Sequence, residues 1–174
     1  IPAGGLFTGA EGVKTPIEVL PTGMPAASFK RGDGARFRRR FDLPANRPLL
    51  LYVGRVAHEK NIGFLLRMFA KLRAQRPDGL FVIAGEGPAR DTLTRAAREL
   101  DVADVVRFIV YLDRQQDLPD CYPAGDVFVF ASRTETQGLV LLEAMAQGTP
   151  VVSTAELGTR SILTPESGAW VVPE

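Results

Sequence analysis

Short apolar segments alternate with longer amphipathic segments along most of this chain, and this alternation constrains the fold more than any other feature. A strand that is apolar on both faces is typical of a parallel sheet covered by helices on each side, because a sheet with one face in water would alternate apolar and polar residues. We therefore predict an α/β fold built on a doubly wound parallel sheet. The predicted strands are residues 49–53, 80–84, 105–110, 126–130 and 149–153 and the segment AWVV.

The segments between these strands have the periodicity of helices. Apolar side chains recur at helical spacing from Ile62 to Leu72, Asn61 can serve as the N-cap, and Pro77 is expected to end this helix. In an open sheet of this kind, ligands bind beyond the carboxyl ends of the strands, so the loops that follow the strands are the candidate sites. The predicted helices are residues 61–76, 89–100, 117–122 and 138–147.

The length of the chain, 174 residues, suits one domain with its own core. Residues 1–16 are rich in Gly, Pro and small residues without a period, which predicts a linker or a poorly ordered segment. The folded domain is predicted to span residues 17–174 and to begin with a short strand, IEVLP. Because the first residue is Ile rather than Met, we expect the chain to be a piece of a longer protein.

The charge balance argues against a nucleic-acid partner. The formal net charge is +1, whereas nucleic-acid binding usually leaves a clearly basic domain. One segment, KRGDGARFRRR at residues 30–40, holds six cations and one acid. We interpret it as the solvated face of a helix, with contact to an anionic membrane surface as the alternative.

Cysteine and histidine usage indicates the compartment and argues against a metal site. The lone Cys121 cannot form an internal disulfide, and no apolar run approaches the roughly 20 residues that a bilayer span needs. We expect a cytoplasmic chain, peripheral to the inner face of the membrane if the cationic segment contacts lipid. No metal site is predicted, since His58 and Cys121 lack partner ligands at zinc-like spacing.

The loop after the first predicted strand, GRVAHEKN, has the composition of an anion site. Gly54 allows close approach of the backbone, and Arg55 and Lys60 flank a predicted helix N-terminus. The alternative is that Arg55 pairs with Glu59 and that Lys60 is merely exposed. The loop after the second strand, GEGP, is a weaker signal, and we interpret it as a tight turn rather than a phosphate contact.

The segment ETQGLVLLEAMAQGTP carries two acids, Glu135 before the predicted helix and Glu143 within an apolar run. A buried ionised carboxylate is costly unless it is paired, so Glu143 needs a donor. The amides of Gly138, Leu139 and Val140 are predicted to be unpaired donors in the first helical turn.

Together these groups fit a nucleoside diphosphate sugar. The two cations and the helix amides would hold the diphosphate, Glu143 would accept both hydroxyls of the ribose, and Glu135 would face the sugar beyond the β-phosphate.

The motifs GRVAHEKN, GEGP, FIVYLD and ETQGLVLLEAMAQGTPVV resemble those of the retaining, group 1 (family 4) nucleotide-sugar glycosyltransferases, whose fold is called GT-B. The resemblance covers residues 17–174 and implies a Rossmann-like, C-terminal donor-binding domain. It implies an N-terminal acceptor domain that this chain lacks, so the chain alone would be inactive. We expect catalysis without metal or cofactor, because Arg55 and Lys60 would take the place of a metal ion. The base would lie at the loop after VVRF, where Val110 stands in place of the Gly of many relatives. The resemblance assigns catalysis to Arg55, Lys60 and Glu135. It assigns donor binding to these three residues and to Gly54, Gly138, Leu139, Val140 and Glu143.

Two other functions stay open. A non-catalytic module that binds nucleotide sugars would carry the same motifs. A dinucleotide-binding oxidoreductase domain would share the fold, but the three-glycine fingerprint expected in its first βα turn is missing. The sequence identifies neither the base, the sugar nor the acceptor.

Overall fold

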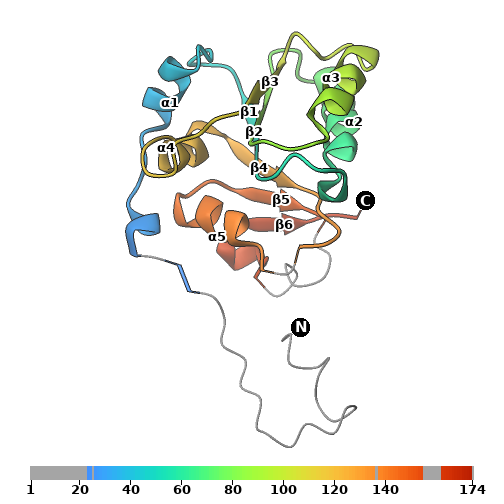
Figure 1. Ribbon diagram of the computed structural model, residues 1–174. Coiled ribbons are helices and arrows are strands. Elements are labelled where there is room, and N and C mark those ends of the chain that lie inside the picture. Colours follow the sequence, from blue (N-terminus) through green and yellow to red (C-terminus); the bar gives the residue numbers. More distant parts are fainter. Residues whose placement is uncertain (1–22, 25, 136, 155–161, 174) are drawn as a thin grey trace, which may run out of the picture.

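The computed structural model describes residues 23–173 except residues 25, 136 and 155–161 (Figure 1). The predicted linker at residues 1–16 and the predicted strand IEVLP therefore lie outside the described residues. The strands are β1 (Leu49–Val53), β2 (Leu80–Ala84), β3 (Val106–Ile109), β4 (Val127–Phe130), β5 (Val151–Ser153) and β6 (Ala169–Val171). The α-helices are α1 (Gly34–Arg40), α2 (Ile62–Arg73), α3 (Arg90–Glu99), α4 (Asp117–Ala124) and α5 (Leu139–Ala146). The short 3₁₀ helices are η2 (Ala26–Phe29), η3 (His58–Lys60) and η5 (Pro165–Ser167).

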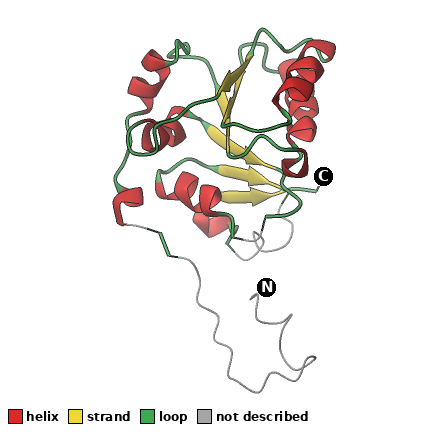
Figure 2. Cartoon of the chain, in the orientation of Figure 1, coloured by secondary structure: helices red, strands yellow, loops and turns green. Residues whose placement is uncertain are grey.

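The six strands form one parallel sheet in the order β3-β2-β1-β4-β5-β6. Helices α2 and α3 lie on one face, and α1, α4 and α5 lie on the other (Figure 1), so the sheet in Figure 2 is a layer between two layers of helices. This is the doubly wound α/β fold that the sequence predicts. The strand order reverses between β1 and β4, which is the position where ligands bind in such sheets.

The central strands carry the core. Every residue of β1 and β2 is buried, and fully burying one Val, Leu, Ile or Phe side chain contributes roughly 1.5–3 kcal/mol. The expectation of cover on both faces is wrong at the edge strand β6, where Trp170 is 59% exposed. An edge strand has a neighbouring strand on one side only, so its burial depends on what other elements reach it.

Helix α2 is shorter than the pattern predicts. It begins at Ile62 after the η3 turn, and Asn61 stands at the N-cap in a left-handed conformation without a capping hydrogen bond from its side chain. It ends at Arg73, before the predicted stop at Pro77. The amide of Arg76 turns back to the carbonyl of Leu72, and a residue that precedes proline is biased away from helical geometry.

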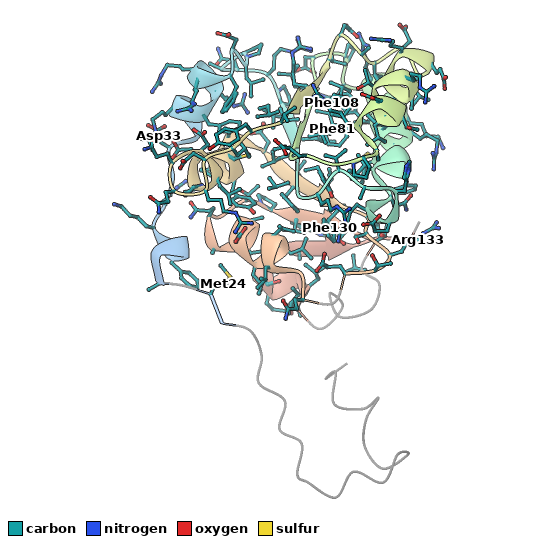
Figure 3. All side chains as sticks on the ribbon, in the orientation of Figure 1. Met24, Asp33, Phe81, Phe108, Phe130 and Arg133 are labelled. Atoms are coloured by element: carbon teal, nitrogen blue, oxygen red, sulfur yellow. The ribbon has the colours of Figure 1, made fainter. Side chains whose placement is uncertain are left out.

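The cationic segment contains α1, and Asp33 lies next to this helix (Figure 3). Asp33 caps α1 by accepting from the Arg36 amide at 2.9 Å. Arg36 makes a two-bond contact with Asp120 on α4, at 2.5 and 2.8 Å, and Arg40 lies 3.2 Å from Asp117. Both arginine side chains remain more than half exposed. The helix interpretation is confirmed, but these two cations also attach α1 to α4. Among the described residues, no helix is long and apolar enough to cross a bilayer.

Candidate functional site

A cavity of about 630 Å³ opens at the carboxyl ends of β1, β2 and β3 and is closed by the start of α5. Its volume falls within the usual range for small-molecule sites, about 300–1,000 Å³. It lies next to the strand switch point, where the fold itself predicts a ligand. The predicted site residues that line it are Gly54, Arg55, Leu139, Val140 and Glu143.

Arg55 stands at the mouth of this cavity on the loop after β1. The buried Tyr52 donates its hydroxyl proton to the Arg55 carbonyl at 3.0 Å, which holds the backbone of the loop. The guanidinium is 66% exposed and lies 3.6 Å from the Glu59 carboxylate. The structure therefore contains the Arg55–Glu59 pair that the sequence offered as the alternative to an anion site. An exposed pair of this kind contributes at most about 1 kcal/mol, and the guanidinium can leave it for an anion.

Lys60 and Glu135 form the contact that the sequence did not predict. The Lys60 ammonium donates to Glu135 at 3.0 Å, and each side chain is only 19% exposed. Lys60 follows β1 and Glu135 follows β4, so the ion pair spans the switch point of the sheet. Neither residue lines the 630 Å³ cavity itself. The structure therefore joins two groups to which the sequence assigned separate ligand contacts.

The Gly138 amide is not the unpaired donor that the sequence predicts. It donates to Glu135 at 3.1 Å, and the Gln137 amide donates to the same carboxylate at 3.4 Å. An acid just ahead of a helix satisfies first-turn donors in this way. Burial alone would raise the pKa of Glu135, but the bonds from Gly138 and Lys60 lower it below its ordinary value. The next residues of α5, Leu139 and Val140, lie at the cavity wall, and first-turn amides have no acceptor within their own helix.

Glu143 is half-buried rather than buried, because its side chain faces the cavity from α5. The donor that the sequence required is Tyr122 on α4, whose hydroxyl donates to Glu143 Oε2. Burial and the neighbouring Glu143 raise the pKa of Tyr122 well above its ordinary value. Tyr122 therefore stays protonated and remains a donor.

The far end of the cavity is formed by the segment after β3, which the sequence proposed as the base site. Val110, Tyr111 and Leu112 line it, and Tyr111 is 73% exposed. Val110 is not among the described residues with positive φ, so the side chain in place of glycine causes no backbone strain.

Sequence reasoning did not assign Glu86, Arg114 and Tyr122 to the site, and all three line the cavity. Arg114 follows β3 at the carboxyl edge of the sheet, so a search of every strand end for cations could have found it. Tyr122 lies within α4, and nothing in its local sequence points to the cavity.

The GEGP loop packs against the loop after β1, and its residues Gly85 and Glu86 also line the cavity. A Cβ atom at Gly85 would lie 2.0 Å from the Gly54 carbonyl oxygen, and one at Gly87 would lie 2.2 Å from that of Val56. The Val56 amide donates to the Glu86 carbonyl at 2.7 Å. These contacts explain why glycine stands at both positions without a role in phosphate binding.

Other features contribute little chemistry to the site. Among the residues that the structure describes, no group of three His, Cys, Asp or Glu side chains could hold a metal ion. Another cavity, of about 310 Å³, lies between α2 and the sheet, and none of the described residues that line it is charged. Its apolar walls do not suit a phosphate.

Comparisons with known proteins agree with this geometry. The family described as Glycosyl transferases group 1 matches residues 33–174. D-inositol 3-phosphate glycosyltransferase 2 from Catenulispora acidiphila is 40% identical over 146 residues, which cover 79% of this chain and 34% of that protein. Sucrose-phosphate synthase from Thermosynechococcus elongatus superposes with a TM-score of 0.74 at 30% identity, over 90% of this chain and 39% of the other. Anabaena HepE, solved in complex with UDP and glucose, superposes with a TM-score of 0.69 at 19% identity, over 86% of this chain and 39% of the other.

The strand order and the cavity at the switch point define a Rossmann-like α/β domain of the GT-B type. The chain belongs to the group 1 glycosyltransferases. It spans about a third of the length of the curated relatives that it matches.

Proposed function

We propose that this chain is the donor-binding domain of a retaining glycosyltransferase that works without a metal ion and moves a sugar from a nucleoside diphosphate sugar to an acceptor held elsewhere in the whole protein. The observation that carries the proposal is that Arg55, the first turn of α5 and Glu143 all line one cavity at the switch point. HepE, which shares the fold, was solved with UDP and glucose, which supports a nucleotide ligand here.

Each group has a proposed role. Glu143 accepts from the ribose hydroxyls, and Arg55 and the amides of Leu139 and Val140 meet the diphosphate. Lys60 stabilises the charge on the leaving diphosphate, the task that a metal ion performs in other transferases. Glu135 faces the transferred sugar, and its ion pair with Lys60 joins it to the cation assigned to the diphosphate.

The retaining outcome rests on the family resemblance. Metal independence rests on the cations of the GRVAHEKN loop, which supply the positive charge that the leaving group requires.

Calorimetry on this chain with UDP, GDP and ADP, each in EDTA, tests the proposal. We expect weak binding of at least one nucleotide, with no gain when Mg²⁺ replaces EDTA. Arg55→Ala should weaken the binding, whereas Arg95→Ala, which removes an exposed cation on α3, should not. No heat with any nucleotide would overturn the donor-site assignment.

A further inference from the structure

Tyr122 lies directly behind Glu143, the residue proposed to bind the ribose, and the proposed function gives Tyr122 no role. Its hydroxyl donates to Glu143 Oε2, and both residues line the cavity. No other hydrogen bond to the Glu143 side chain occurs within the described part of the chain.

The tyrosine is buried and packed in place. It is 2% exposed, and its ring packs in a tilted arrangement against Phe128 of β4 with centroids 5.9 Å apart. Its backbone carbonyl accepts from the buried Thr149 hydroxyl at 2.7 Å. The packing of the buried ring therefore fixes the hydroxyl in the wall of the cavity, whereas the Thr149 bond holds only the backbone of α4.

Packing alone does not explain a tyrosine at this position. The neighbouring core uses phenylalanine, at Phe128 and Phe130, and a buried hydroxyl is costly unless it is hydrogen-bonded. Since the pKa of Tyr122 is raised, the hydroxyl keeps its proton and stabilises the carboxylate by donating a hydrogen bond to it.

Glu143 needs such a partner. Glu143 is partly exposed at a cavity wall, and a free glutamate side chain there would sample several rotamers. Ordering one long side chain upon binding costs conformational entropy, so a carboxylate that is already oriented binds its ligand more tightly.

We propose that Tyr122 is the positioning residue for Glu143: it holds one carboxylate oxygen so that the carboxylate presents its other oxygen to the ligand. The inference rests on the proposed function, because the ligand in question is the nucleoside of a nucleoside diphosphate sugar. Tyr122 acts only through Glu143.

A double-mutant cycle tests this, with UDP and GDP affinity of this chain measured by calorimetry. Tyr122→Phe removes only the hydroxyl, and we expect affinity to fall about three- to tenfold. In the Glu143→Gln background the same change should alter affinity less than about twofold, because the positioned group is already lost. A residue with a purely structural role would lower affinity by the same factor in both backgrounds.

Thr149→Val is the matched control, since it removes a buried hydrogen bond to Tyr122 without touching Glu143. It should lower the melting temperature and leave nucleotide affinity unchanged. If Tyr122→Phe does not fold, Glu143→Asp replaces it: the charge is kept but the shorter side chain cannot reach both partners, so affinity should fall as far as in Glu143→Gln.

The outcomes separate the two proposals. If the wild-type chain binds no nucleotide, the proposed function fails. If the wild type binds and Tyr122→Phe binds equally well, or if Glu143→Asp keeps full affinity, the positioning role alone is overturned.

Discussion

At the scale of single residues, the pairing of Lys60 with Glu135 changes what substitutions at these positions are expected to do. The sequence alone predicts that Glu135→Gln leaves diphosphate binding nearly intact, because it places this acid beyond the β-phosphate. In the structure the carboxylate neutralises a cation assigned to the diphosphate, at 3.0 Å. The two groups therefore cannot be treated as independent.

Glu135→Gln should strengthen the binding of free UDP or GDP about three- to fivefold, because it frees Lys60 and removes a negative charge near the phosphates. Turnover of the full-length enzyme should fall, since the sugar loses its carboxylate. The measurements are calorimetry on this chain and initial rates on the whole protein. Glu59→Gln, which breaks the more exposed pair with Arg55, is the control and should change affinity less. Weaker diphosphate binding in Glu135→Gln would contradict the prediction.

Lys60→Ala should lower turnover of the full-length enzyme by around 10²-fold, the usual loss when a preorganised electrostatic group is removed. Arg55→Ala should have a smaller effect, because its side chain is 66% exposed against 19% for Lys60, and water screens it more. Steady-state rates at saturating donor measure this. Lys71→Ala, an exposed cation on α2, is the matched control. Equal rates for Lys60→Ala and Lys71→Ala would make Lys60 a structural residue.

At the scale of elements, the contact between α1 and α4 depends on two buried carboxylates and on two glycines. Asp120 accepts from Arg36 and from the Asp33 amide, and the Gly32 and Gly34 backbones lie against the backbone of α4. This contact attaches the cationic helix to the layer of helices that carries Tyr122.

Acid should loosen this contact through Asp120. Burial alone would raise its pKa, but the bonds from Arg36 and the Asp33 amide lower it below the ordinary value, about 3.9. A carboxyl whose pKa is lower in the folded state than in the unfolded state stabilises the fold at a pH above its unfolded-state pKa. This stabilisation is lost as the pH falls through the folded-state pKa. Asp120→Asn should therefore melt several degrees lower than wild type at pH 7, with the gap closing below about pH 4. Thermal melts from pH 7 to pH 2.5 measure the gap, and a gap that does not change with pH would contradict this mechanism.

Gly34→Ala should destabilise the chain by about 1–3 kcal/mol, because overpacking forces the backbone to move. Its Cβ would lie 2.3 Å from the Pro123 carbonyl oxygen. Gly63→Ala in α2 is the matched control, since only the flexible end of Arg67 lies near, at 3.6 Å, and alanine favours a helix by up to about 1 kcal/mol. Urea denaturation of both variants should give shifts of opposite sign. A stable Gly34→Ala variant would mean that α1 and α4 can separate without cost.

At the scale of the whole molecule, we propose that the chain supplies the donor side of the reaction. It spans about a third of the length of its curated relatives, and its described residues surround one cavity with charged walls at the sheet switch point. Acceptor binding and closure over the donor belong to the rest of the protein in this proposal.

The purified chain should therefore bind nucleoside diphosphate and transfer no sugar. The assay supplies UDP- and GDP-sugars with acceptor candidates, and follows both the release of diphosphate and the formation of glycoside. The whole protein, assayed in parallel, is the positive control. Glycoside formation by the chain alone would show that the donor domain is sufficient.

The sequence by itself determined the architecture, because the strands are encoded locally. The predicted bounds of β1 and β2 are the observed ones, since each is a continuous apolar run between turn residues. The other strands and α5 differ from prediction by a few residues at their ends, where the hydrogen bonds to neighbouring elements decide the bounds. The loops after β1 and β4 were also identifiable, because in a parallel sheet the carboxyl ends of the strands share one edge.

Only the tertiary structure decided how the site residues pair. Lys60 and Glu135 are 75 positions apart in the sequence, and Tyr122 and Glu143 are 21 apart, so no local pattern encodes either contact. The loop geometry at the switch point places the lysine against the acid, and the acid in turn occupies the Gly138 amide. Sequence periodicity specifies which face of an element is buried, whereas the partner of a charged side chain depends on the distances between elements that only the packed fold sets.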